Sequence, residues 1–253
     1  MFLMRILPGV LKELLKHVPT VLFEAVEWSE LASEVPKLTK KLVQKEGFVQ
    51  LFKAQKVFLA PLSIQLTEED LKKESPTITK DVAEKWLTLY FAQLFSPHGV
   101  FLDLRPHNFS TFGDELRWHP TGFWHKFSEP FRQGLINIYD GFYLGNEELY
   151  HRGLIELGLA KENWSEEDKK KLADLFKDQF GASLGQEMSF NLEGFRNSLI
   201  KITDFLLVKK VKISTDFLYL GIYLVFMYSA LEKSNDKFPV KEIYLNIRKK
   251  LIQ

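Results

Sequence analysis

The sequence predicts an α+β fold that is mostly helical, with a small sheet beside a large helical domain. Strand-like runs are short and occur only in the first half of the chain. After Pro130 the chain has helical periodicity and helix-capping residues almost to its end. The 22 Phe residues provide enough aromatic surface for a sizeable packed core.

Residues 1–66 are expected to form a reduced N-terminal region of one strand, helices and further short strands. Residues 2–7 are an apolar run stopped by a Pro-Gly pair, which predicts a strand that ends in a turn. Residues 10–17 can form a short helix. Apolar residues spaced three and four apart then predict an amphipathic helix across residues 28–47.

The middle of the chain alternates between short strands and one long helix. Residues 48–52 and 57–66 have strand-like composition. One face of residues 79–95 is apolar, and a Ser-Pro-His-Gly sequence follows, which predicts a helix and its end. Residues 100–102 predict a short buried strand, and residues 109–118 predict a hairpin around Gly-Asp.

Residues 67–253 are expected to form a helical domain that packs with the N-terminal region as one compact unit. Asp168 follows Ser165 by three residues, which resembles a capping box. Further helix starts are predicted at Ser214 or Thr215 and at Pro239.

Composition and charge exclude several classes of protein. The net charge of +1 provides no global field for nucleic acid, so no nucleic-acid partner is expected. The absence of Cys excludes disulfides and thiolate metal sites. Residues 217–231 are apolar but shorter than the roughly 20 residues of a membrane span, which predicts a buried core helix. Lys12 and Glu13 come too early for a signal peptide, and a cytoplasmic protein is expected.

Residues 100–109 contain the most informative chemical pattern, an Asp at the end of a strand and an Asn five residues later. In kinase-like enzymes such an Asp accepts the hydrogen bond of the attacking hydroxyl, and the Asn reaches a magnesium ion on the nucleotide phosphates. Asp103 and Asn108 are therefore the candidate catalytic base and metal ligand.

The segment 101–108 resembles the H-x-D-x-H-P-x-N catalytic loop of the AarF/UbiB family of atypical protein-kinase-like proteins. Asp103, Pro106 and Asn108 match this pattern, and Arg105 replaces the second His. The resemblance implies a kinase-like helical lobe after a reduced nucleotide-binding lobe. It extends to flanking segments at 93–99, 122–123, 144–146, 154–159 and 217–223.

The N-terminal residues resemble the family's nucleotide-binding strand, but its functional groups are replaced. Met4 stands at the position of the nucleotide-binding Lys and has no charge to bind phosphates. Glu30 and Glu34 lie roughly where the family places an acidic pair. His119 is nearest to the position of the family's metal-binding Asp, and a neutral imidazole is a weak magnesium ligand.

These departures predict a pseudokinase, that is, a non-catalytic binding or scaffold protein. The resemblance implies a protein partner, a possible lipid or membrane surface at the inner membrane, and an accessory role in isoprenoid-quinone (ubiquinone) or lipid metabolism. No cofactor is expected. One alternative is a weak ATP-dependent kinase or ATPase, with Asp103 as base and Asn108 and His119 near ATP and magnesium. Another is a structural subunit of a larger complex.

Each candidate also has a structural interpretation. Asp103 and Asn108 can bond to local backbone groups in a tight loop. Glu30 and Glu34 can belong to a solvated helix face. The basic runs at 169–171 and 248–250 are solvated faces or a membrane-surface contact. A metal site is an alternative for four His residues, namely His98, His107, His119 and His125.

Overall fold

The computed structural model has an α+β fold that is mostly helical, which confirms the predicted fold class. The expected strand at 2–7, the expected helix at 10–17, and both Met4 and Glu30 lie outside the described residues. Within the expected helix at 28–47, the described positions before residue 47 are helical. The structure describes residues 33, 34, 36, 37, 40, 41, 47–68, 76–179 and 187–251.

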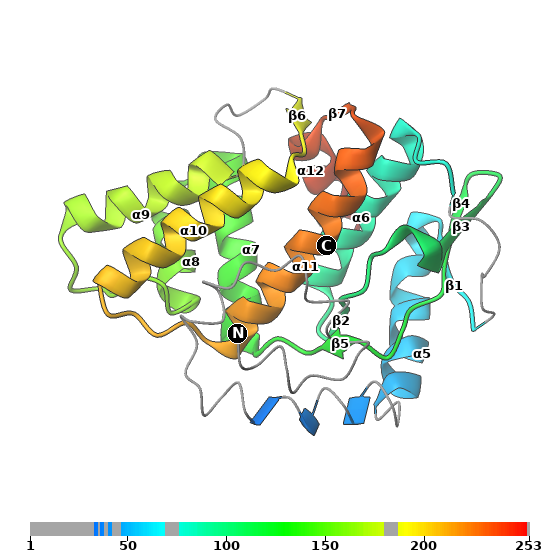
Figure 1. The fold of residues 1–253 in the computed structure, drawn as a ribbon, viewed down its shortest axis with the longest axis horizontal. Helices are drawn as coiled ribbons and strands as arrows, with labels where there is room; N and C mark the ends of the chain where they lie inside the picture. Colours follow the sequence, from blue (N-terminus) through cyan, green and yellow to red (C-terminus); the bar gives the residue numbers. More distant parts are fainter. Residues whose placement is uncertain are drawn as a thin grey trace.

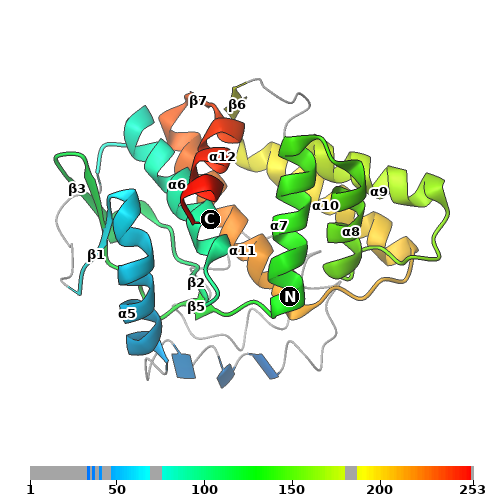
Figure 2. The same ribbon diagram turned by 180° about the vertical axis from the view of Figure 1, so that it is seen from behind.

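The molecule has a small sheet at one end and a group of helices at the other (Figure 1). Helix α11 crosses the middle, with α6 and α7 near it, and α8, α9 and α10 form the end opposite the sheet (Figures 1 and 2). The helices are α5 (Phe48–Leu59), α6 (Lys80–Phe95), α7 (Glu129–Leu144), α8 (Glu147–Glu156), α9 (Glu166–Gln179), α10 (Leu192–Val208), α11 (Thr215–Leu231) and α12 (Val240–Leu251). Single 3-10 turns are η1 (Ala60–Leu62), η2 (Pro106–Asn108) and η3 (Glu232–Ser234).

Within the described ranges, short strands pair in three places. The strands are β1 (Ile64–Leu66), β2 (Val100–Phe101), β3 (Phe109–Phe112), β4 (Glu115–Trp118), β5 (Trp124–His125), β6 (Met188–Ser189) and β7 (Lys237–Phe238). The predicted hairpin is confirmed, because β3 pairs antiparallel with β4 across Gly113, which has a φ of 56°. β1 adds to β4 in parallel, with Ile64 opposite Leu116. The pairs β2–β5 and β6–β7 are antiparallel.

The strands predicted at residues 48–52 and 57–66 are largely wrong. Residues 48–59 form α5, and only Ile64–Leu66 is a strand. The buried residues of α5, Leu51, Phe52, Gln55 and Leu59, recur at helical spacing along one face. The aromatic and β-branched composition favoured strand, but packing of this face against the sheet and α6 decides in favour of helix.

The long helices confirm most of the remaining predictions. Thr79 accepts a hydrogen bond from the backbone N of Val82 at the start of α6. The Oγ of Ser165 accepts one from the backbone N of Asp168 at the start of α9, at 3.2 Å. Ser214 caps α11 by accepting from the backbone N of Phe217.

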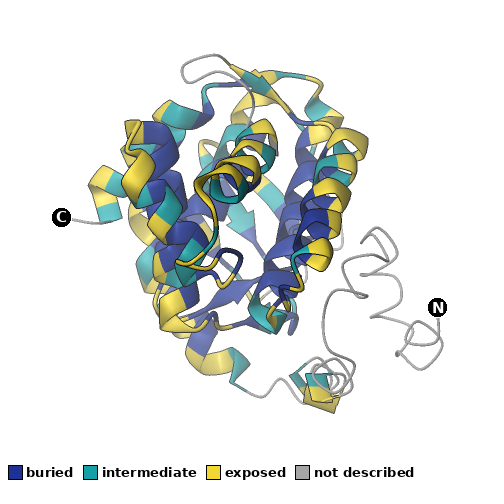
Figure 3. Cartoon of the chain, turned by 90° about the vertical axis from the view of Figure 1, so that its left-hand side faces the viewer, coloured by how far each residue is buried: buried dark blue, intermediate teal, exposed yellow. Residues whose placement is uncertain are grey.

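The core lies between the central helices, whose buried positions face inward (Figure 3). Almost all residues of α11 are buried, which confirms the predicted core helix at 217–231. Among the described residues, no helix is both long enough and apolar enough to cross a membrane. Helices α7 and α8 meet at Gly141, where an added Cβ would overlap the backbone of Tyr150. The glycine therefore allows the two helix backbones to approach closely.

Candidate functional site

The loop after β2 brings the two predicted catalytic residues together. Asp103 follows the strand directly, and Asn108 closes the 3-10 turn η2. The side-chain Nδ2 of Asn108 donates to the backbone O of Asp103 at 3.3 Å. Both side chains are buried, with exposed fractions of 1% and 5%. The amide of Asn108 therefore bonds within the loop.

The carboxylate of Asp103 is held by Arg105 of the same loop. Arg105 donates from Nε to Oδ1 and from Nη2 to Oδ2, both at 2.7 Å. Its backbone N also donates to Oδ1, at 3.3 Å. Thr121 Oγ1 donates to Oδ2 at 3.3 Å from the segment after β4. Each carboxylate oxygen of Asp103 thus has two donors. The two-point contact with the Arg105 guanidinium balances the negative charge of the carboxylate.

This geometry limits what Asp103 can do chemically. A general base must lie within hydrogen-bond reach of the hydroxyl it activates. Asp103 is 1% exposed, and its lone pairs face Arg105 and Thr121. The observed hydrogen bonds of Asp103 and Asn108 are the ones expected if the two residues serve to order a tight loop.

Among the described residues, the hydrogen bonds of His119 go to Thr67 and Asn108 and not to Asp103. Its Nδ1 lies 3.2 Å from the backbone O of Thr67, and its backbone N donates to the backbone O of Asn108. Because a carbonyl oxygen only accepts, Nδ1 carries the hydrogen. The position beside the Asp103 carboxylate belongs to Thr121, which sequence analysis missed.

Glu34 contacts α11. Its carboxylate accepts from the Tyr219 hydroxyl at 2.8 Å and from Lys37 Nζ at 2.7 Å. Partial burial opposes ionisation, but the hydrogen bonds from Lys37 and Tyr219 outweigh it and lower the pKa of Glu34. A solvated helix face therefore explains the bond between Glu34 and Lys37. It does not explain the bond between Glu34 and Tyr219.

A polar cluster that sequence analysis missed joins β5, α7 and α11. We call it the His125 cluster: Glu34, His125, Ser128, Asp216 and Tyr219. His125 Nε2 lies 2.6 Å from Asp216 Oδ1. Asp216 Oδ2 accepts from Ser128 Oγ at 2.6 Å and from Ser128 N at 3.1 Å. The His125 ring stacks on Tyr219 at 3.8 Å. The sequence signal for this cluster was Asp216, an acidic residue in the first turn of the apolar helix α11.

The His125 cluster is not a nucleophile-base arrangement. Ser128 donates to Asp216 and not to His125, whereas a serine nucleophile must bond to its base. Burial opposes the charge of Asp216, but the hydrogen bonds from His125 and Ser128 lower its pKa. Its geometry is that of a buried carboxylate that joins two helix starts.

The four His residues considered for a metal site differ in their partners and exposure. His125 bonds to Asp216 and His119 to Thr67, while His98 and His107 are exposed. In the part of the chain that the structure describes, no three His, Asp or Glu side chains gather closely enough to hold a metal ion.

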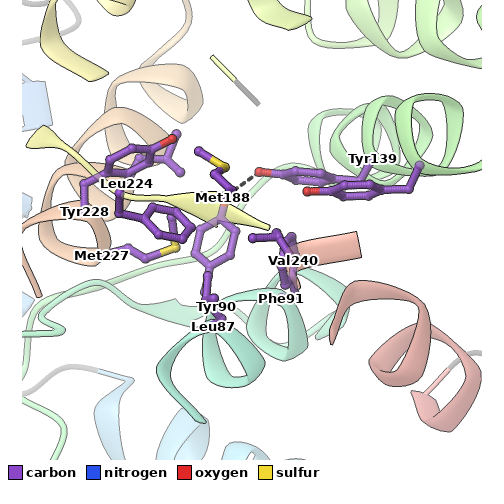
Figure 4. A pocket seen from close by; sticks show the side chains of 11 residues that line it. Leu87, Tyr90, Phe91, Tyr139, Met188, Leu224, Met227, Tyr228 and Val240 are labelled. Carbon is purple, nitrogen blue, oxygen red and sulfur yellow. Dashed lines mark hydrogen bonds between the residues drawn. The ribbon is translucent and has the colours of Figure 1, made fainter. Parts of the chain in front are cut away.

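An apolar cavity lies between α6, α7 and α11 (Figure 4). Its volume is about 20 Å³, which is room for roughly one water molecule. Apolar side chains dominate its wall, so it offers little to a polar ligand and is best described as a packing gap. The lining residues are Leu87, Tyr90, Phe91, Tyr139, Tyr143, Met188, Phe190, Leu224, Met227, Tyr228 and Val240.

The comparisons with known proteins add no family assignment. Neither protein-family models nor curated proteins match the sequence. The AarF/UbiB resemblance therefore stays a prediction from motifs, and the chemistry of the loop follows from its own geometry.

Proposed function

We propose that this protein is a kinase-like binding or scaffold protein that does not transfer phosphoryl groups. The observation that carries the proposal is the two-point ion pair between Asp103 and Arg105, at 2.7 Å for each of its two bonds. The motif around these residues resembles a phosphotransfer loop, but its carboxylate already has a cationic partner within the loop.

Phosphoryl transfer depends on positioning and on electrostatic stabilisation of the transferring group. A base that is desolvated and paired with a guanidinium has no accessible oxygen for a substrate hydroxyl. Breaking the pair to free Asp103 would leave a buried carboxylate without its cation, which is costly. The replacements at Met4 and His119 add to this, because the resemblance places the phosphate-binding Lys and the metal-binding Asp there.

A loop ordered by its own ion pair is suited to binding, since few degrees of freedom are left to lose on association. The resemblance suggests the kind of partner, namely an enzyme of isoprenoid-quinone or other lipid metabolism that this protein assists. A lipid or membrane surface is a second possible contact of such a scaffold.

The catalytic part of the proposal is tested by phosphate release and by thermal unfolding with ATP and either magnesium or manganese. We expect neither turnover nor a change in Tm for the natural sequence. A rise in Tm, or phosphate release, that Asp103→Asn abolishes would overturn the proposal in favour of a weak kinase or ATPase.

Arg105→His restores the residue that the family pattern has at this position. Arg152→His is the matched control, because Arg152 forms an exposed pair with Glu148 on α8. We expect neither variant to gain turnover, since Met4 and His119 are unchanged in both. Turnover in Arg105→His would show that one substitution restores an otherwise competent site, which contradicts the proposal.

The scaffold part is tested by purification from the native cell followed by mass spectrometry of bound proteins and lipids. An enzyme of lipid or isoprenoid-quinone metabolism bound in stoichiometric amount is the expected result. A protein that is recovered as a free monomer contradicts the scaffold role.

A further inference from the structure

We propose that the His125 cluster is an acid-sensitive contact that holds a short segment against α11, and that protonation of His125 releases it. The segment means the described residues 33, 34, 36, 37, 40 and 41, all of them helical. The proposal is independent of the kinase-like function. It rests on the geometry of a buried imidazole, on one ring nitrogen that bonds to none of the described residues, and on two contacts that reach the segment from β5 and α11.

The hydrogen on His125 can be assigned from its partner. Nε2 lies 2.6 Å from Oδ1 of Asp216, whose pKa is lowered by the hydrogen bonds from His125 and Ser128 despite burial. An ionised carboxylate only accepts, so Nε2 carries the hydrogen in the neutral ring. Nδ1 then carries no hydrogen and has a free lone pair. It is buried, and it makes no hydrogen bond to any residue that the structure describes.

The ring of His125 connects Asp216 to the segment through Tyr219. His125 stacks on Tyr219 with ring centroids 3.8 Å apart and planes 19° apart. The Tyr219 hydroxyl donates to Glu34 at 2.8 Å, although the two residues are 185 positions apart in the sequence. Nearby, Lys41 Nζ lies 4.4 Å from the centre of the Trp124 ring. Both contacts attach the segment beside β5 and the start of α11.

Protonation of His125 would place a second N–H at Nδ1, which has no hydrogen-bond partner among the described residues. The charged groups that face the ring are Asp216 from α11, with Glu34 and Lys41 from the segment. Burial, with a smaller contribution from Lys41, lowers the pKa of His125 below its ordinary value of 6.5, against the effect of Asp216 and Glu34. The attached state therefore favours the neutral ring.

The direction of the pH effect follows from this pKa. In the proposed detached state water reaches His125, and the ring takes up a proton at a pH closer to its ordinary pKa of about 6.5. The attached state binds its proton only at lower pH. Attachment is thus unaffected well above about pH 6.5 and weakens as the pH falls from there towards the lowered pKa.

The segment is the element that detaches, because α11 is buried along almost its whole length. The segment contacts α11 and β5 through side chains such as Glu34 and Lys41. The carboxylates of the cluster remain ionised through this pH range. The pKa of Glu34 lies below its ordinary value of 4.5, and the pKa of Asp216 lies below its ordinary value of 3.8. His125 is then the group in the cluster that titrates.

The test uses the absence of Cys from the natural sequence. Pro36→Cys places a single thiol on an exposed position of the segment for a nitroxide spin label. We expect a mobile component of the spectrum that grows as the pH is lowered from about 8 to about 5, and that reverses on neutralisation. Unchanged mobility across this range would overturn the proposal.

Substitutions at His125 separate its protonation from other effects of acid on the protein. His125→Phe keeps an aromatic ring on Tyr219 but cannot be protonated, so we expect its label mobility to be the same at both pH values. His125→Gln serves the same purpose if the Phe variant does not fold. Tyr219→Phe removes the bond to Glu34 and should be mobile already at about pH 8. A pH response in the His125 variants equal to that of the natural sequence contradicts the assignment to His125.

Discussion

Arg105 binds both carboxylate oxygens of Asp103, two residues earlier in the same loop, at 2.7 Å each. The two side chains are unequally buried, since Arg105 is 33% exposed and Asp103 only 1%. Such a pair contributes little beyond what it costs to desolvate, but removing one member leaves the other buried and unpaired. The loop therefore depends on both residues being present.

Arg105→Ala is expected to destabilise the protein by about 2–4 kcal/mol, because it leaves the Asp103 carboxylate buried without its cation. Urea unfolding followed by circular dichroism measures this change. The double variant Asp103→Asn with Arg105→Ala should lose less than the sum of the two single variants, since neither charge remains. Simple additivity would show that the two side chains are energetically independent.

Part of this loop could be predicted from the sequence and part could not. The Asp-to-Asn spacing places Asp103 and Asn108 at the two ends of one short loop, because the backbone between them is local. Thr121 is 18 positions further on, and it reaches Asp103 only because β5 folds back along β2. Contacts that depend on strand pairing cannot be read from local spacing.

Asp216→Asn is expected to destabilise the protein by about 2–3 kcal/mol, because one carboxylate accepts from both His125 and Ser128. Ser128→Ala removes one of these donors and should cost less, about 1 kcal/mol. Thermal unfolding near neutral pH ranks the two variants. Equal losses would indicate that the bond to Ser128 carries the whole effect.

The Asp216 carboxylate also affects how the free energy of unfolding changes in acid. Its pKa is lowered in the folded protein, so its contribution is fully present above its ordinary value of 3.8 and is lost as the pH falls towards the lowered value. The Asp216→Asn variant should therefore lose less stability than the natural sequence as the pH falls below about 4. Acid titration of the free energy of unfolding provides the measurement. An unchanged slope in this range would contradict the role of Asp216.

The incorrect strand prediction at 48–52 has a physical cause. The segment contains Phe48, Val49, Leu51 and Phe52, whose types favour strands. Such short apolar runs do not distinguish a strand from a buried helix, because both bury neighbouring apolar residues. Gln55 was the missed signal. It is fully buried on α5, and it donates to Ser96 Oγ at 2.9 Å, a contact that helical spacing from Leu51 makes possible.

Arg248→Lys is expected to destabilise the contact between α12 and α7 by about 1 kcal/mol, because an ammonium cannot form the two-point geometry of a guanidinium. Arg248 donates to Asp140 at 2.6 and 3.0 Å, and Tyr244 donates to the same carboxylate at 2.7 Å. Arg152→Lys is the control, since its pair with Glu148 is exposed and should contribute almost nothing. Chemical denaturation that gives the same loss for both variants would contradict this account.

Gly141→Ala tests the close approach of α7 and α8. A Cβ at Gly141 would overlap the backbone of Tyr150, so the helices must separate, and we expect a loss of about 2–4 kcal/mol in the free energy of unfolding. Gly194→Ala is the matched control in the first turn of α10, where the nearest atom to an added Cβ is the side-chain Oδ1 of Asn191 at 3.2 Å and no backbone among the described residues overlaps it. Alanine has the higher helix propensity, so the control should be neutral or slightly stabilising. Because intrinsic propensity favours Ala at both positions, opposite signs in the two variants isolate the helix contact as the cause. A neutral Gly141→Ala variant would show that α8 can move away from α7 without loss of core packing.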